Sequence, residues 1–186
     1  MNLNEWFEKG LTPDEYINGM EKNKEEMVSL YKTFMVGNEE KERLEKLKNK
    51  GLKVISITED WCGDALLNNP ILMKLAEAGG IELRFLLRDQ NLELMDQYLT
   101  NGTSRAIPIF IFIDNEGNEA AVWGPRAPQM QERVDKGRVS LPDKEAADFQ
   151  EKQMEFYKQL VKSYVTDESI WKMVSESIVG ALSSVK

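Results

Sequence analysis

Hydrophobic residues recur with two different periods along this chain, and the change of period separates predicted helices from predicted strands. Apolar side chains at roughly helical spacing occupy residues 13–36, 144–165 and 168–182. These patterns predict amphipathic helices. Residues 13–36 are long enough for one long helix or two. Near-continuous apolar runs rich in β-branched residues occupy 52–57 and 107–113. Runs of this kind are typical of strands that are buried on both faces.

Shorter patterns connect these segments into an α/β arrangement. Strand, helix and strand over 52–57, 63–78 and 81–87 form a βαβ unit, which predicts two parallel strands with a right-handed crossover. The turn residues at 114–117 join the strand at 107–113 to another at 118–123 as an antiparallel hairpin. Thr12 followed by Pro13 predicts a helix start. Further helices are expected at 39–50, ending at Gly51, at 91–99 and at 129–136.

Composition removes several classes of function. The chain has 186 residues and a formal net charge of −8, which argues against binding to nucleic-acid phosphates. It contains no histidine, so Ser-His-Asp and Cys-His catalysis and His-containing metal sites are excluded. We expect neither a metal nor a cofactor. No secretory signal or membrane-spanning run is visible, and one cysteine suits a reducing compartment, so a cytoplasmic protein without membrane contact is expected.

The single cysteine lies at the junction between a strand and a helix. Cys62 follows the apolar run at 52–57 and precedes the helical pattern at 63–78. The free N–H groups and the dipole at a helix N-terminus favour an anion, so a thiolate is favoured at this position. Cys62 is therefore the candidate catalytic residue.

At Trp61-Cys62-Gly63 the chain resembles the thioredoxin superfamily, whose Trp-Cys-Gly-Pro-Cys motif occupies such a turn. Pro70 matches a proline that kinks the family's helix eight residues after the first cysteine. Ile107-Pro108 resembles the family's cis-proline, which faces the cysteine, and Gly124 matches a glycine after its last strand. The resemblance covers roughly residues 39–136.

The resemblance implies a single α/β domain over 1–186, with a mixed sheet of four to five strands flanked by helices. The thioredoxin-like core would span about 39–136, with helical extensions at 1–38 and 137–186. The departures concern the chemistry. Asp64 and Ala65 stand where thioredoxins have proline and the second cysteine, and Ser56 stands where they keep a buried acid. Dithiol cycling within this chain is therefore impossible.

The acidity of Cys62 depends on charges that oppose one another. The helix N-terminus favours the thiolate, whereas the carboxylates of Glu59, Asp60 and Asp64 disfavour a second negative charge. Arg105 is the one cation that could approach from the cis-proline loop. We expect a thiol pKa modestly below the free value, with its direction left open. Trp123 and Arg126 are expected to pack at the end of the hairpin.

Two functions remain. The first is a monothiol protein that forms mixed disulfides at Cys62 with a protein or low-molecular-weight thiol partner, because a second thiol must be borrowed. The alternative is a non-catalytic binding module that holds an extended peptide by backbone pairing. A Cys62–Cys62 homodimer is a third alternative. In both main readings the substrate groove consists of Trp61, Gly63, Asp64, Ile107 and Pro108.

Overall fold

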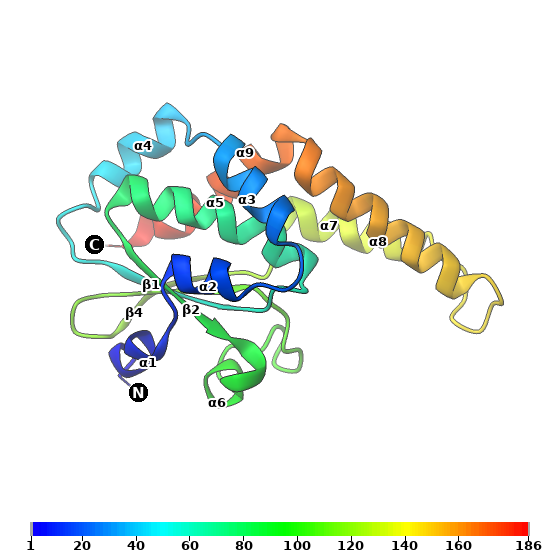
Figure 1. Ribbon diagram of the computed structural model, residues 1–186, viewed down its shortest axis with the longest axis horizontal. Helices are drawn as coiled ribbons and strands as arrows, with labels where there is room; N and C mark the ends of the chain where they lie inside the picture. The colour runs from blue at the N-terminus through cyan, green and yellow to red at the C-terminus, as the bar shows by residue number, and fades with distance from the viewer. Residues whose placement is uncertain (1, 186) are drawn as a thin grey trace.

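The computed structural model describes residues 2–185 and places a four-stranded sheet at its centre (Figure 1). The strand order is β2-β1-β3-β4. β1 pairs with β2 in parallel, while β3 runs antiparallel to both β1 and β4. The predicted βαβ unit, hairpin and mixed sheet are therefore confirmed. The strands are β1 (Lys53–Thr58), β2 (Glu82–Leu87), β3 (Ile109–Ile113) and β4 (Glu119–Trp123).

Helices cover both faces of the sheet (Figure 1). Along β1, Val54 belongs to the apolar cluster formed with α3, α5 and α9, whereas Ile55 and Ile57 belong to the cluster formed with α1 and α6. This alternation follows from the two-residue period of a strand. The helices are α1 (Asn4–Lys9), α2 (Pro13–Gly19), α3 (Lys24–Thr33), α4 (Asn38–Glu45), α5 (Gly63–Gly79), α6 (Leu92–Met95), α7 (Pro128–Val139), α8 (Phe149–Thr166) and α9 (Glu168–Ala181), with 3₁₀ turns η1 (Arg88–Gln90) and η2 (Leu182–Ser184).

Several helix boundaries differ from the prediction. The helix expected over 13–36 is two helices, α2 and α3, and Thr12 forms the capping box that begins α2. The helix expected over 39–50 ends at Glu45, and turns continue to Gly51. The helix expected over 91–99 shrinks to the four residues of α6. These segments carry mostly exposed polar side chains, so little burial stabilises a longer helix.

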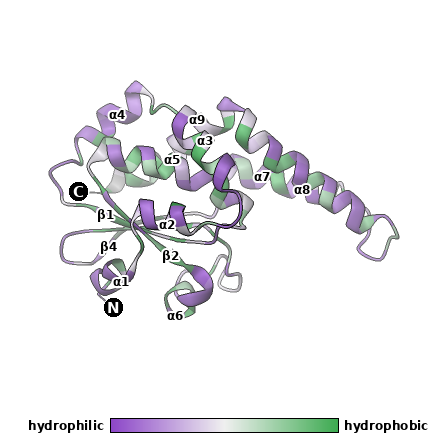
Figure 2. Ribbon diagram, viewed as in Figure 1, coloured by the Kyte–Doolittle hydropathy of each residue, from purple (hydrophilic) through white to green (hydrophobic). Residues whose placement is uncertain are grey.

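A helical hairpin of α7 and α8 extends from the sheet body (Figure 1). α7 continues past Gly137 to Val139, although a helix ending at residue 136 was expected, and α8 begins at Phe149 rather than at residue 144. A Cβ on Gly137 would lie 2.0 Å from the Phe156 ring, so glycine permits this close approach of the two helices. Hydrophobic and hydrophilic residues alternate along α8 (Figure 2). Leu160 and Tyr164 belong to the apolar cluster of the body and Phe156 packs against it, whereas Met154 is exposed.

Candidate functional site

Cys62 lies at the N-cap of α5, in the turn that follows β1, and its side chain is only partly exposed. The Sγ atom lies 3.5 Å from the carbonyl oxygen of Ile107, to which its thiol donates. The side chain makes no capping hydrogen bond, but the backbone N–H groups of Ala65 and Asp64 at this helix start act to lower the pKa of the thiol. The helix start therefore offers donors to a thiolate, and the neighbouring strand offers an acceptor to the thiol.

Pro108 lies in the segment that leads into β3, next to Ile107, whose carbonyl oxygen contacts Cys62. The Ile107–Pro108 peptide bond is cis, and both side chains are buried. Gly124 packs against the same segment with φ at 131°, and a Cβ there would lie 2.3 Å from the Pro108 carbonyl oxygen. Only glycine meets both the backbone conformation and the space at this position.

Asp64 forms a largely buried ion pair with Arg126, which lies in the loop before α7. Arg126 Nε donates to Asp64 Oδ1 at 2.9 Å, and its second nitrogen contacts Oδ2. The two side chains are 12% and 15% exposed. The Tyr164 hydroxyl, on α8, also donates to Asp64 Oδ1 at 2.9 Å. Three segments far apart in sequence thus meet beside Cys62.

α8 covers part of the Cys62 turn. A Cβ on Gly63 would lie 3.0 Å from Val161 Cγ2, and Tyr164 is 1% exposed where it meets Asp64. Ala65, at the position of the second thioredoxin cysteine, is also 1% exposed. The expectation that Arg126 merely packs is therefore incomplete. No sequence pattern indicates Tyr164, which is separated from Asp64 by 100 residues.

Burial, followed by the nearby Asp64 carboxylate, raises the pKa of the Cys62 thiol to about 11. The N–H groups of Ala65 and Asp64 and the charge of Arg126 act in the opposite direction, but they do not prevail. The expected pKa slightly below the free value is therefore wrong. Near pH 7 only about one Cys62 in ten thousand carries the thiolate.

The other charged residues predicted near the sulfur are engaged elsewhere. Asp60 accepts hydrogen bonds from the backbone of Glu21 at the start of the segment that leads to α3, and Glu59 accepts one from Asp89. Arg105 pairs with Asp96 on the surface, with Nε 2.6 Å from Oδ1. Arg126, not Arg105, is the cation near Cys62, because the chain after Gly124 turns back towards α5.

Trp61, next to Cys62 in the turn, is 45% exposed. The Arg88 guanidinium lies 4.9 Å from its ring centroid, a cation–π contact that orients the ring at the edge of the turn. Arg88 also donates to the Arg105 carbonyl oxygen, which connects this edge to the segment before Pro108. Trp61 thus borders the side of the turn that α8 leaves uncovered.

A buried polar network replaces the acid that thioredoxins keep beneath the site. Ser56 Oγ donates to Asn69 Oδ1 at 3.0 Å, and Asn69 Nδ2 donates to Thr58 Oγ1 at 2.9 Å and to the Tyr16 hydroxyl at 3.4 Å. All four residues are buried. These neutral groups satisfy one another and supply no titrating group near neutral pH, since burial raises the pKa of Tyr16 to about 12.

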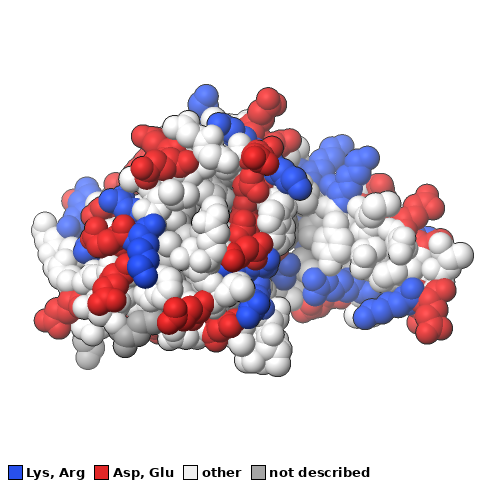
Figure 3. Space-filling view, turned by 60° about the horizontal axis from the view of Figure 1, so that its bottom comes forward, with Lys and Arg blue, Asp and Glu red and all other residues white. Residues whose placement is uncertain are grey.

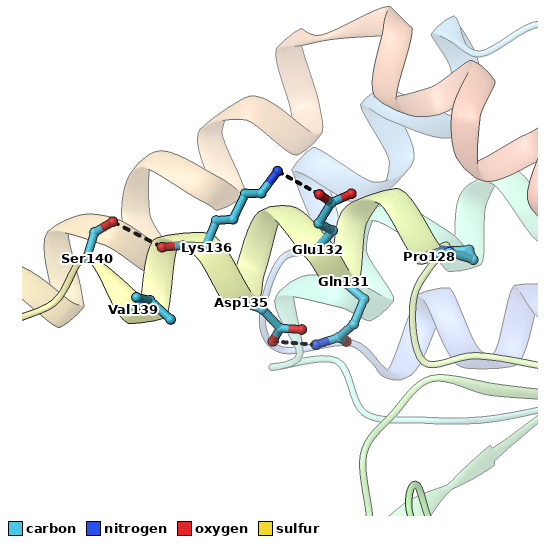
Figure 4. Close-up of a pocket in the computed structure, with 7 residues that line it drawn as sticks. All are labelled: Pro128, Gln131, Glu132, Asp135, Lys136, Val139 and Ser140. Atoms are coloured by element: carbon cyan, nitrogen blue, oxygen red, sulfur yellow. Dashed lines mark hydrogen bonds and ion pairs between the residues drawn. The ribbon is translucent and has the colours of Figure 1, made fainter.

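Several surface hollows lie away from Cys62. One of about 710 Å³ follows the outer face of α7 (Figure 4). Its polar side chains pair with one another, because Lys136 contacts Glu132 and Gln131 donates to Asp135. On the face shown in Figure 3, acidic and basic side chains are interspersed rather than gathered into a basic surface. Within residues 2–185, no group of acidic or cysteine residues is arranged to hold a metal ion, and no helix is long and apolar enough to cross a membrane.

The sequence model of a family described as thioredoxin matches residues 10–139, which is more than half of the chain. The chain therefore belongs to the thioredoxin family. Among solved structures, it is similar to a protein of unknown function from Pseudomonas aeruginosa, with a TM-score of 0.64 and 14% identity over 94% of this chain and 97% of that one.

An HIV epitope scaffold has a TM-score of 0.61 and 14% identity over 94% of this chain and 98% of the scaffold. The thioredoxin of Fasciola hepatica is 28% identical over 51% of this chain and 88% of its own, with a TM-score of 0.34. None of the curated proteins matches the sequence. The first two similarities extend over the terminal helices as well as the sheet, so those helices are part of a fold that other chains also adopt.

Proposed function

We propose that this thioredoxin-like protein forms mixed disulfides through Cys62 with a partner bound along Trp61, Gly63 and Pro108. The observation that carries the proposal is the placement of the sulfur. It sits at the start of α5, where the N–H groups of Ala65 and Asp64 act to lower its pKa, and it lies 3.5 Å from the Ile107 carbonyl oxygen. Although Cys62 packs against the apolar cluster beside α1 and α6, it is partly exposed and lies at a helix start, where a thiolate is favoured.

The reaction is an exchange of one disulfide for another. The Cys62 thiol loses its proton to solvent, and the thiolate attacks one sulfur of a partner disulfide. The new S–S bond forms as the old one breaks, and the second partner sulfur leaves as a thiolate that takes up a proton. A low-molecular-weight or protein thiol must then reduce the mixed disulfide, because the chain has one cysteine. A reducing compartment such as the cytoplasm suits this cycle.

The test is the reaction of reduced protein with bis(2-hydroxyethyl) disulfide, a probe that carries no charge to be repelled by Asp64. Intact-mass measurement should detect one adduct, formed faster as the pH rises, since the thiolate fraction grows tenfold per pH unit below the thiol pKa. The Cys62→Ser variant should form none. The proposal fails if the folded protein forms no adduct at about pH 9 while the unfolded protein does.

A second function is favoured by the raised pKa of Cys62. A thiol that is protonated at neutral pH suits a binding module in which the same groove holds an extended segment by backbone pairing and Cys62 only donates to Ile107. Isothermal titration with a captured partner peptide separates the two functions. Cys62→Ser would retain full affinity in the binding module, whereas it would lose covalent capture in the monothiol protein.

A further inference from the structure

In the ion pair beside Cys62, all three nitrogens of the Arg126 guanidinium have a partner. Arg126 gives Nε and one terminal nitrogen to Asp64, and the other terminal nitrogen donates to Gln131 Oε1 at 2.9 Å. Both members of the pair are largely buried, and Tyr164 closes it from α8. No hydrogen bond joins Arg126 to the Cys62 sulfur among the described residues, so its effect on the thiol is exerted through charge and position.

The charges that Cys62 meets come from few groups. On α5, Asp64 opposes ionisation of the sulfur, while Arg126, from the loop before α7, favours it. The phenols of Tyr16 on α2 and Tyr164 on α8 also face the site, and burial raises the pKa of each above the neutral range. Asp60 and Glu59 are held by backbone N–H groups elsewhere. Below about pH 11, the Asp64–Arg126 pair is thus the charged pair that acts on the sulfur.

We propose that Arg126 is a positioning residue that sets the reactivity of Cys62 through Asp64. By pairing with Asp64 it limits the negative charge that a thiolate meets, and Asp64 in turn withholds the Arg126 cation from the sulfur. The pair keeps the thiol in a weakly reactive state. This inference rests on the proposed function only in taking Cys62 as the reacting group.

If the Asp64–Arg126 pair acts by charge, replacing Asp64 and replacing Arg126 should change the reactivity of Cys62 in opposite directions. If it acts only as a structural contact, both replacements should change it in the same direction. If the pair acts by charge, removing the carboxylate leaves an uncompensated cation beside the sulfur and favours the thiolate. Removing the cation leaves an uncompensated carboxylate and disfavours it. If the pair only ties α8 over the turn, either change loosens that cover, and Cys62 becomes more reactive in both variants.

The experiment measures the rate of Cys62 alkylation by iodoacetamide, an uncharged reagent, as a function of pH. In Asp64→Asn the thiol pKa should fall by about one unit, which makes alkylation about tenfold faster at about pH 8. In Arg126→Gln alkylation should be about tenfold slower at the same pH. Arg126→Lys keeps the charge without the two-pronged contact, so its rate should return towards that of the wild type.

Tyr164→Phe is the matched control, because it loses a hydroxyl at the same contact and keeps both charges. Its profile should remain that of the wild type. Near-ultraviolet circular dichroism establishes that each variant is folded. Should Arg126→Gln fail to fold, the acceleration in Asp64→Asn, absent from Tyr164→Phe, still decides the sign.

Acceleration in both charge variants, or an unchanged rate in Asp64→Asn, would overturn the inference. This outcome is independent of the mixed-disulfide test. Opposite shifts in alkylation with no adduct from bis(2-hydroxyethyl) disulfide would leave the charge role intact and reject the proposed function. A mixed disulfide together with equal alkylation rates in all variants would support the proposed function and reject the charge role.

Discussion

Two Asp–Arg pairs of the same chemistry differ in burial, and only one of them acts on the candidate site. Asp64–Arg126 is 12% and 15% exposed and lies beside Cys62, whereas Asp96–Arg105 is 46% exposed on both sides. A surface pair is screened by water and contributes little, while a buried pair retains its field and is costly to break. Burial, rather than the presence of an arginine near the cis-proline loop, decides which cation influences the thiol.

The largest expected effect comes from breaking the buried pair. Arg126→Gln leaves the Asp64 carboxylate largely buried with only Tyr164 as a side-chain donor, so the free energy of unfolding should fall by about 3 kcal/mol. Urea denaturation measures it. Arg105→Gln is the control at the exposed pair and should leave the midpoint unchanged. Equal losses in both variants would show that burial does not distinguish the pairs.

Alkaline pH should sharpen the contrast through Cys62 itself. The folded thiol has a pKa of about 11 against an ordinary value of 9.0, so between these values the unfolded chain releases a proton that the folded chain retains. Stability linked to this thiol is therefore present below about pH 9 and is lost as the pH rises through about 11, by about 3 kcal/mol.

The measurement is the free energy of unfolding at several alkaline pH values, compared between the wild type and Cys62→Ala. The subtraction removes the titration of tyrosines and lysines, which both proteins share. The wild type should lose more stability than the variant. Parallel pH profiles would show that the folded thiol ionises like a free one.

A smaller effect is expected from the hydroxyl that completes the buried pair. Tyr164→Phe removes a hydrogen bond to a charged carboxylate, which should cost about 1.5 kcal/mol in urea denaturation. Tyr157→Phe, on the same helix, removes an exposed contact with Arg138 and should cost under about 0.5 kcal/mol. If Tyr157→Phe costs as much, α8 stabilises the body through packing alone.

The smallest effect concerns the thiol and the exposed pair. Arg105→Gln should leave the rate of Cys62 alkylation unchanged at every pH, because Arg105 contacts Asp96 on the surface and contributes no charge at the sulfur. If Arg105→Gln slowed alkylation as much as Arg126→Gln does, Arg105 would also act on the Cys62 thiol.

The pattern of the sequence was sufficient for the sheet but not for the surroundings of Cys62. Runs such as 52–57 and 107–113 predict strands because local periodicity reports burial directly. The order of Trp61, Cys62 and Gly63 before Pro70, with Ile107-Pro108 and Gly124 later, was sufficient for the family. Which side chains meet the sulfur depends on how distant segments return to it, and periodicity carries no such information.

Asp64 illustrates the difference. In sequence it is a carboxylate next to a cysteine, and its counter-charge cannot be identified from spacing. In the structure the loop after β4 brings Arg126 to it, and α8 brings Tyr164. The same is true of Ser56 on β1, whose partner Asn69 lies on α5 and also donates to Thr58. The role of the groove formed by Trp61, Gly63, Ile107 and Pro108 stays a prediction.

The most direct test of the account is the rate at which bis(2-hydroxyethyl) disulfide forms an adduct with Cys62 in Asp64→Asn relative to the wild type at about pH 8. This ratio depends both on whether Cys62 exchanges disulfides and on whether the Asp64–Arg126 pair controls it. The account predicts an adduct in both proteins, formed about tenfold faster in the variant. No adduct in either protein, or equal rates in the two, would contradict it.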